Sequence, residues 1–235
     1  MKKWNEIPDF MKNNEVKKYY DILQQKKTSL LLKRIFDIFF SLFGLLLFLP
    51  VILILSVIIK LDSKGPVFYR QERVTIYNKT FKIFKFRTMV QNADKIGTLV
   101  TIDNDKRITK VGNIIRKFRL DEIPQLINVL IGDMSFIGTR PEVRKYVDQY
   151  SNEMKATLLM KAGVTSMTSI LFKDEAEIIN KWTKENEDID DIYIKKILPL
   201  KMKYNLEYIQ KFNIYYDIKV IINTLLAVSG LKQFN

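Results

Sequence analysis

The stretch IFFSLFGLLLFLPVILILSVII, from Ile38 to Ile59, has 22 residues and no charge. A straight helix of that length reaches roughly 33 Å, about the thickness of the hydrocarbon core of a bilayer. Pro50 divides the run into arms of 12 residues (38–49) and 9 residues (51–59), and neither arm crosses a bilayer alone. The stretch predicts a membrane helix, either a Pro-kinked span or a helix–break–helix that enters and leaves by one face.

Basic residues flank this run on both sides, with Lys33 and Arg34 before it and Lys60 and Lys64 after it. The positive-inside bias favours the cytoplasm for both flanks, which is the arrangement of the hairpin. A Pro-kinked span is nevertheless common, because neighbouring groups satisfy the freed backbone carbonyl. The residues alone therefore leave both forms open, and they argue only against a cleaved signal peptide, since no small-residue cleavage site follows.

Composition narrows the chemistry of this 235-residue chain, which contains no Cys and no His. Disulfides, thiolate sites and His-containing triads are excluded, so catalysis must rely on carboxylates, Lys, Arg, hydroxyl groups and hard ions such as Mg²⁺. The net charge is +13, and residues 60–119 hold 15 Lys and Arg against 5 Asp and Glu. This basic region suits an anionic partner (phosphate, anionic lipid or nucleic acid), or equally a solvated basic face.

The pattern predicts an α+β fold: a mostly helical, membrane-associated domain with short strands. Residues 1–34 form a basic segment whose apolar cluster is expected at the membrane interface, 35–60 the membrane helix, and 61–235 a domain with interfacial helices. The cluster contains Trp4, Ile7, Phe10 and Met11. Strands are expected at 67–69 and 80–86, and helices over 121–130, 142–160, 192–211 (with a break at Pro199) and 214–228, with an acid-rich solvated segment over 174–191.

Asp121 and Glu122 are the first candidates for chemistry. Adjacent carboxylates project differently, so one can attack phosphorus while the other holds a cation. Arg116, Lys117 and Arg119 precede the pair and are suited to phosphate oxygens. The structural alternative is ordinary: Asp121 caps a helix and Glu122 complements its dipole.

Two further segments suit anion binding. Residues 82–89, KIFKFRTM, alternate cations with aromatics, which is typical of a strand with one cationic and one apolar face. Residues 132–142, GDMSFIGTRPE, form a loop in which Arg140 is held next to Pro141, and a rigid Arg binds anions well. A plain amphipathic strand and a plain turn would explain the same residues.

Taken together and in this order, the segments resemble one family. PVFYRQERV, FKIFKFRTM, RLDEIPQLINVLIGDMSFIGTRPEV and LLMKAGVTSM are similar to the bacterial sugar transferases, the small monotopic phosphoglycosyl transferases that prime glycan assembly on a polyprenyl phosphate. The resemblance runs from about residue 33 to about residue 228. It implies an enzyme at the cytoplasmic face of the cell membrane that moves a sugar-1-phosphate from a UDP-sugar to undecaprenyl phosphate, in the first step of a membrane glycoconjugate pathway.

The resemblance also implies roles for individual residues. It makes Asp121 the nucleophile that expels UMP and Glu122 a ligand of Mg²⁺. It also makes 35–60 a re-entrant helix–break–helix anchor with its break at Pro50, and 61–235 a cytoplasmic catalytic domain. The substrate-binding residues that it implies are Lys85, Arg87, Arg116, Arg140 and Pro141. UDP-sugar, undecaprenyl phosphate and membrane lipid are the expected partners and nucleic acid is not, while the oligomeric state, a homo-oligomer included, stays open. A membrane-tethered basic module that binds anionic lipid or nucleic acid is the alternative, but it gives Asp121 and Glu122 no role.

Some positions depart from the family pattern. Leu49 stands where Ser usually precedes the Pro, Thr75 and Asn78 stand where Gly is usual, and Thr139 and Ala162 replace usual Pro residues. Asn tolerates a left-handed backbone, whereas Thr does so poorly. These differences concern the nucleotide pocket and the sugar preference, and neither the sugar nor the glycan pathway follows from the sequence.

Overall fold

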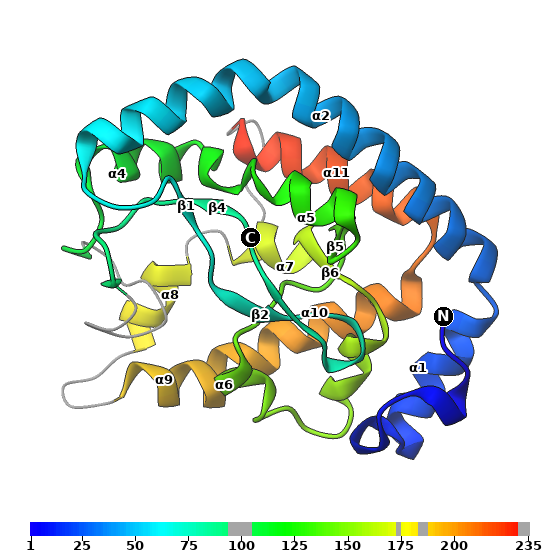
Figure 1. The fold of residues 1–235 in the computed structure, drawn as a ribbon. Helices are drawn as coiled ribbons and strands as arrows, with labels where there is room; N and C mark the ends of the chain where they lie inside the picture. Colours follow the sequence, from blue (N-terminus) through cyan, green and yellow to red (C-terminus); the bar gives the residue numbers. More distant parts are fainter. Residues whose placement is uncertain (94–104, 173–174, 183–187, 230–235) are drawn as a thin grey trace.

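The longest element of the computed structural model, which describes residues 1–93, 105–172, 175–182 and 188–229, is the helix α2 (Lys27–Asp62). Figure 1 shows α2 as an arc across one side of the molecule. The helix continues through Pro50, so the predicted interruption is not seen. A single Pro removes one backbone hydrogen bond, which bends a helix more readily than it ends it. Re-entrant insertion at this Pro therefore remains a prediction.

The first half of α2 has a largely polar buried side and an apolar exposed side, the reverse of a helix in water. Its buried residues Lys33, Asp37, Ser41 and Gly44 recur every three or four positions and form one stripe toward the domain. The opposite side exposes large apolar side chains, among them Phe39, Phe43, Leu46, Leu47, Leu53, Ile54 and Val57. In the described residues α2 alone has the length and composition to cross a membrane. These features are consistent with membrane association.

Both ends of the apolar run are attached to the same domain. Near the start, Arg34 donates to the carbonyl oxygens of Val129 (2.7 Å) and Leu130 (2.9 Å). Beyond its end, the Arg87 guanidinium donates to the carbonyl oxygens of Ser63 (2.7 Å) and Lys64 (2.8 Å). The domain therefore contacts α2 before and after the segment that was expected to enter the bilayer.

The described part of the domain is mostly helical, with three pairs of short strands. The helices after α2 are α4 (Lys110–Lys117), α5 (Gln125–Ile131), α6 (Arg144–Val147), α7 (Met167–Leu171), α8 (Glu175–Trp182), α9 (Ile189–Ile192), α10 (Leu198–Lys211) and α11 (Ile214–Val228). The strand pairs are β1 (Phe68–Tyr69) with β4 (Lys85–Phe86) and β2 (Glu72–Val74) with β3 (Thr80–Lys82), both antiparallel, and β5 (Met134–Ile137) with β6 (Ala162–Thr165), parallel. The predicted α+β class is confirmed.

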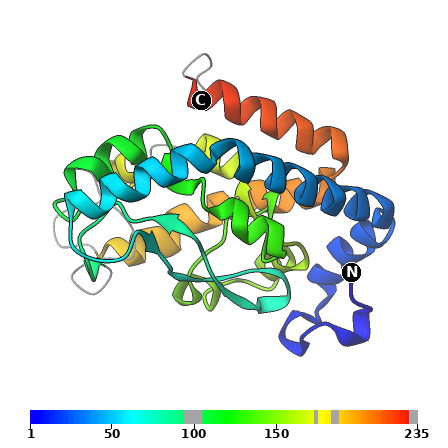
Figure 2. The same ribbon diagram turned by 45° about the horizontal axis from the view of Figure 1, so that its top comes forward.

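Helix α11 runs beside the first half of α2 (Figure 2). A buried ion pair joins them, with 2.6 Å between Lys33 Nζ and Asp217 Oδ2, and the Tyr208 hydroxyl of α10 donates to the other oxygen of Asp217 at 2.8 Å. The remaining faces of α11 expose Tyr215, Ile218, Ile221, Ile222 and Leu225. An apolar surface shared by α2 and α11 results, as expected for interfacial helices.

The amino-terminal segment differs from its prediction. Ile7 and Met11 are buried in the main core together with Val16, Tyr20 and Leu23 of α1 (Asn14–Gln24). The apolar cluster expected at the membrane interface is thus divided, because these two residues pack against protein and only Phe10 stays exposed. Residues 1–24 belong structurally to the domain.

Two predicted helices also need correction. The segment 142–160 contains α6 and a separate turn η5 (Met154–Leu159), because the Ser151 hydroxyl accepts a hydrogen bond from Met154 N and starts a new turn. The segment 192–211 has no break at Pro199: a π-helical turn, η6 (Tyr193–Ile197), leads directly into α10, where Pro199 lies in the first turn. Within the described part of the acid-rich segment, Ile179 and Asp190 are buried, so it is only partly solvated.

Candidate active site

The acidic pair lies in the turn η4 (Leu120–Glu122), between α4 and α5. Arg119, just before it, has a left-handed backbone (φ 56°), which turns the chain sharply. For a non-glycine residue this conformation costs on the order of 1–3 kcal/mol, and such residues cluster at functional sites. Asp121 is 7% exposed, so its carboxylate is held largely away from solvent.

Asp121 is not the helix cap that the alternative interpretation requires. The helix α5 begins at Gln125 with Pro124 before it, and no side chain caps either α5 or η4. The predicted helix start at Asp121 was therefore wrong, because the chain passes through a 3₁₀ turn and Pro124 first. The Asp121 carboxylate has no capping role, and its ion-pair partner is a Lys side chain.

That partner is Lys85, which joins both acids. Its Nζ lies 3.1 Å from Asp121 Oδ2 and 3.1 Å from Glu122 Oε1. Arg140 approaches Glu122 from another side, with 3.6 Å between its guanidinium nitrogen and Oε1. Four candidate residues from three separate segments of the sequence therefore lie together: Lys85, Asp121, Glu122 and Arg140.

These cations control the ionisation of Glu122. Burial alone would raise the pKa of its carboxyl group, but Lys85, Arg140 and Arg119 together outweigh burial and lower the pKa to about 2. Burial would likewise lower the pKa of the Arg140 guanidinium, and Glu122, with Glu175 and Glu142, raises it instead. Glu122 is thus a carboxylate at neutral pH, and Arg140 keeps its charge.

The position of Lys85 depends on a residue that the sequence reading missed. Asn128 of α5 is fully buried, and its amide oxygen accepts from Phe84 N (2.8 Å) while its amide nitrogen donates to Lys82 O (3.1 Å). These bonds fix the strand segment that carries Lys85 against the helix that follows the acidic pair. No local signal in the sequence distinguished Asn128.

Arg73 of β2 holds the loop that presents Arg140. Its guanidinium donates to Pro141 O at 3.1 Å, and no sequence argument nominated it. Below the loop, Gly138 and Gly163 meet backbone to backbone, and a Cβ atom on Gly163 would lie 2.2 Å from Gly138 N. Only glycine permits this approach, which brings the Arg140 loop onto β6.

The other nominated residues lie in different surroundings. Arg116 on α4 is partly buried; burial lowers its pKa and the attraction of Asp121 opposes that shift, so it belongs to the same electrostatic cluster. Arg87 is 5% exposed and points to the carboxyl end of α2 instead. Its role as a substrate ligand stays a prediction that this geometry does not favour.

The departures from the family pattern lie close to this loop. Thr75 has an extended backbone (φ −132°), so it avoids the strain of a left-handed conformation. Tyr77 (φ 53°) and Asn78 (φ 63°) are left-handed instead. The Thr75 hydroxyl donates to Asp133 O at 2.8 Å and accepts from Ala162 N at 3.1 Å. Thr75 and Ala162, two positions that depart from the family pattern, are therefore in direct contact.

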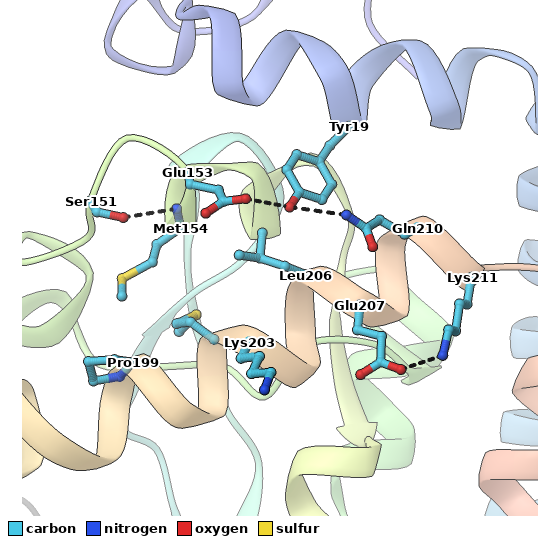
Figure 3. Close-up of a pocket in the computed structure, with 11 residues that line it drawn as sticks. Tyr19, Ser151, Glu153, Met154, Pro199, Lys203, Leu206, Glu207, Gln210 and Lys211 are labelled. Atoms are coloured by element: carbon cyan, nitrogen blue, oxygen red, sulfur yellow. Dashed lines mark hydrogen bonds and ion pairs between the residues drawn. The ribbon is translucent and has the colours of Figure 1, made fainter.

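A small cavity opens at the cluster. Its wall consists of Arg73, Ile83, Lys85, Glu122, Gln125, Arg140, Pro141 and Gly163. A larger hollow of about 540 Å³ lies elsewhere, among residues that include Tyr19, Glu153, Lys203 and Gln210 (Figure 3). No nominated residue lines that hollow, so the small cationic cavity is the candidate active site.

Magnesium fits this donor set only in part. Among the described residues no group of three or more Asp, Glu, His or Cys side chains is placed to hold a metal ion. Asp121 and Glu122 still offer hard carboxylate oxygens, and Mg²⁺ is often bound by one or two carboxylates together with substrate phosphates. A metal that arrives with a diphosphate is compatible with the site.

The fold and the site define a membrane-associated α+β domain whose paired carboxylates and surrounding cations suit phosphate chemistry. The bacterial sugar transferase family model matches residues 28–230. The chain belongs to this family, as its resemblance implied.

Curated relatives extend this finding. A UDP-N-acetylgalactosamine-undecaprenyl-phosphate N-acetylgalactosaminephosphotransferase from Aeromonas hydrophila is 36% identical over 84% of the chain and 43% of the relative. A UDP-glucose:undecaprenyl-phosphate glucose-1-phosphate transferase from Escherichia coli is 37% identical over 83% of the chain and 39% of the relative. The chain thus spans less than half of these two proteins. An uncharacterized sugar transferase, EpsL, from Bacillus subtilis is 30% identical over 88% of the chain and 93% of its own length.

Proposed function

We propose that this protein transfers a sugar-1-phosphate from a UDP-sugar to undecaprenyl phosphate and releases UMP, through a phosphosugar covalently bound to Asp121. This reaction is the first step of a membrane glycoconjugate pathway such as capsule, exopolysaccharide, O-antigen or glycoprotein glycan synthesis. The names of the two longer relatives support the donor and acceptor classes.

One observation carries the proposal: a buried carboxylate that caps no helix and pairs with a cation of the cavity wall. Lys85, the partner of Asp121, lines the cavity together with Glu122 and Arg140. A purely structural acid would normally be saturated by backbone donors or by a helix end. A nucleophile toward phosphorus instead needs an accessible oxygen with cations nearby to hold the phosphate.

The reaction divides into two displacements at one phosphorus. In the first, an Asp121 oxygen attacks the phosphorus that carries the sugar; the carboxyl–phosphate bond forms, and the bond to the UMP oxygen breaks. In the second, a phosphate oxygen of the lipid attacks the same phosphorus and releases the Asp121 carboxylate. The products are UMP and a polyprenyl diphosphate sugar, so each step requires only one phosphorylated substrate in addition to the enzyme.

The surrounding residues have separate roles in this scheme. Arg140 and Arg116 neutralise phosphate oxygens, and Lys85 reduces the repulsion between Asp121 and an incoming anion. Glu122, ionised at neutral pH, is the residue that would hold Mg²⁺. When bound, the metal would stabilise charge on the departing UMP.

The experiment is an assay of UMP release over a panel of UDP-sugars, with undecaprenyl phosphate and Mg²⁺. A parallel incubation without the lipid acceptor should leave a phosphosugar on the peptide containing residues 120–125, detectable by mass spectrometry. Absence of UMP release with every UDP-sugar, from a folded and membrane-inserted protein, would reject the proposal. A basic binding module would show neither product.

The membrane arrangement is part of the proposal, with both ends of the apolar run at the cytoplasmic face. It is supported by the attachment of Arg34 to α5 and of Arg87 to the end of α2. A bilayer-spanning α2 would separate these contacts by the thickness of a membrane, so at least one set would have to break. Insertion from one face keeps both sets.

The absence of native Cys makes this arrangement simple to test. Single replacements Ser29→Cys and Lys64→Cys should both resist an impermeant thiol reagent in intact cells and both react after permeabilisation. Reaction of only one site in intact cells would contradict insertion from one face. Pro50→Leu should shift the protein toward a true span, because the uninterrupted apolar helix is long enough.

A further inference from the structure

Gln125 is a polar residue in the cavity wall that neither the sequence argument nor the proposed mechanism uses. It is the first residue of α5, one helical turn beyond Asp121, and it is only 2% exposed. Gln125 lines the cavity together with Lys85, Glu122 and Arg140. A buried amide at this place is either part of the packing or part of the binding site.

Its hydrogen bonding distinguishes these two roles. Within the described residues the Gln125 amide forms no side-chain hydrogen bond, whereas the amide of Asn128 on the same helix contacts Phe84 N, Lys82 O and Asp133 Oδ2. Asn128 therefore has a structural role. The side-chain amide of Gln125 is available for a hydrogen bond to a ligand in the cavity.

A second unpaired group lies in the same wall. The Nε of Arg73 is buried and has no partner in the described part of the chain, although the other guanidinium nitrogens contact Pro141 O and Gln71 Oε1. Arg73, Lys85 and Arg140 are cationic, and Glu122 is the one acid in this wall. The charge and the unpaired N–H groups both favour an anion with several acceptor oxygens.

We propose that the Gln125 amide nitrogen donates a hydrogen bond to a phosphate oxygen of the bound nucleotide sugar. This inference rests on the proposed function, since the nucleotide diphosphate is the anion that the reaction requires. Gln125 is then a substrate-binding residue whose neutral donor adds to the cationic ones without repelling them.

Two substitutions of similar size test the direction of the hydrogen bond. Gln125→Leu removes it and should raise KM for the UDP-sugar about 10- to 100-fold, as expected for a lost bond to a charged group. Gln125→Glu replaces the donor by an anion and should be worse than Gln125→Leu, because the carboxylate repels the phosphate. KM and kcat for UMP release are measured for both, and melting temperatures show whether the variants fold.

The opposite order of the two variants would overturn the inference. If Gln125→Glu were more active than Gln125→Leu, the amide would accept a hydrogen bond instead of donating one; if both stayed within twofold of wild type, Gln125 would not contact substrate. The matched control is Gln210→Leu in the larger hollow, where the Gln210 amide contacts the Tyr19 hydroxyl at 3.4 Å (Figure 3). This variant should retain wild-type KM.

A binding measurement separates this inference from the proposed function. UDP-sugar binding is measured calorimetrically in the Asp121→Asn background, with and without Gln125→Leu. Binding at least tenfold weaker in the double variant supports the contact even if wild type transferred nothing. Equal binding would reject it even if the transferase reaction were established.

Discussion

Two clusters of similar composition include residues of the loop that carries Arg140 and Glu142. In one, Lys85 joins Asp121 and Glu122 at 3.1 Å each. In the other, Lys201 of α10 joins Glu142 (3.0 Å) and Glu175 (3.1 Å) and also donates to the Tyr193 hydroxyl at 2.5 Å. Each cluster consists of one ammonium group and two carboxylates, so residue types alone do not tell them apart.

Exposure and saturation separate them. The Lys85 side chain is 24% exposed and that of Arg140 29%, against 3% for Lys201. Glu142 is further satisfied by the Tyr193 hydroxyl, which donates to it at 2.8 Å. The Lys201 cluster has little remaining capacity for a ligand, whereas the Lys85 cluster borders a cavity. We infer that the Lys201 cluster is structural and that the Lys85 cluster is catalytic. Substitutions in the two clusters test this contrast.

The largest effect is expected at Asp121. Asp121→Asn keeps the shape and removes the nucleophilic oxygen, so UMP release should fall on the order of 10³-fold or more, and the covalent adduct should disappear. Because Asp121 caps no helix, the melting temperature should change little. Substantial turnover by this variant, with deamidation excluded, would make the covalent mechanism wrong.

The reverse pattern is expected at Lys201. Lys201→Met leaves Glu142 and Glu175 without their buried counter-ion, which costs about 3–5 kcal/mol of folding free energy. The loss is read from denaturant unfolding. Adding Glu142→Gln should restore part of it, because the uncompensated charge is removed. Undiminished stability together with lost activity would assign Lys201 to catalysis and break the contrast.

The two clusters also differ in how much of each could be predicted from the sequence. Asp121, Glu122, Lys85 and Arg140 stood in recognisable segments, and the structure brings them together. Glu142, Lys201 and Tyr193 gave no local signal, because their pairing depends on tertiary packing of α10 and η6 against the loop before α6. Asn128 and Gln125 looked alike in the sequence, and only burial and hydrogen bonding separate their roles.

The fold, like the two clusters, could be predicted from the sequence only in part. The long uncharged apolar run predicted α2, and apolar residues with polar ones on one side predicted α11, since both signals are local. The continuation of the helix through Pro50 and the burial of Ile7 and Met11 did not follow from the local pattern. Both depend on what packs against those residues, and a single sequence does not contain that information in local form.

A smaller effect is expected from pH. The folded-state pKa of Glu122, about 2, lies below its ordinary value of 4.5, so its ion pairs stabilise the fold above pH 4.5 and are lost as pH falls toward 2. Glu122→Gln should therefore flatten the dependence of the unfolding free energy on pH between 4.5 and 2.

The same variant connects pH with catalysis. Glu122→Gln also removes the charged ligand of Mg²⁺ and should leave little activity at neutral pH, with the fold intact. Excess EDTA should abolish wild-type turnover, and Mn²⁺ should substitute for Mg²⁺. Full turnover in EDTA would remove the metal from the mechanism, and an unchanged pH profile in the variant would contradict the lowered pKa.

The smallest effect is expected at the contacts that β6 makes with Thr75 and with the loop that carries Arg140. Thr139 O accepts from Gly163 N at 2.8 Å, and the adjacent Ala162 N donates to the Thr75 hydroxyl at 3.1 Å. The family usually has Pro, which lacks an N–H, at the position of Ala162 and Gly at the position of Thr75. We infer that these two departures compensate each other, because the hydroxyl of one satisfies the buried N–H of the other.

A double-mutant cycle measures that compensation. Thr75→Val removes the hydroxyl and leaves the Ala162 N–H unpaired, which should cost about 1–3 kcal/mol. Ala162→Pro removes the N–H while the Thr75 hydroxyl still donates to Asp133 O, so it should cost about 1 kcal/mol or less. In the double variant no N–H remains to be satisfied, and its unfolding free energy should fall by about 1 kcal/mol less than the sum of the single effects. Strict additivity would mean that the two residues changed independently. A positive coupling with unchanged KM would instead show that the loop between the two clusters is supported locally, so that departures from the family pattern need not alter the site above them.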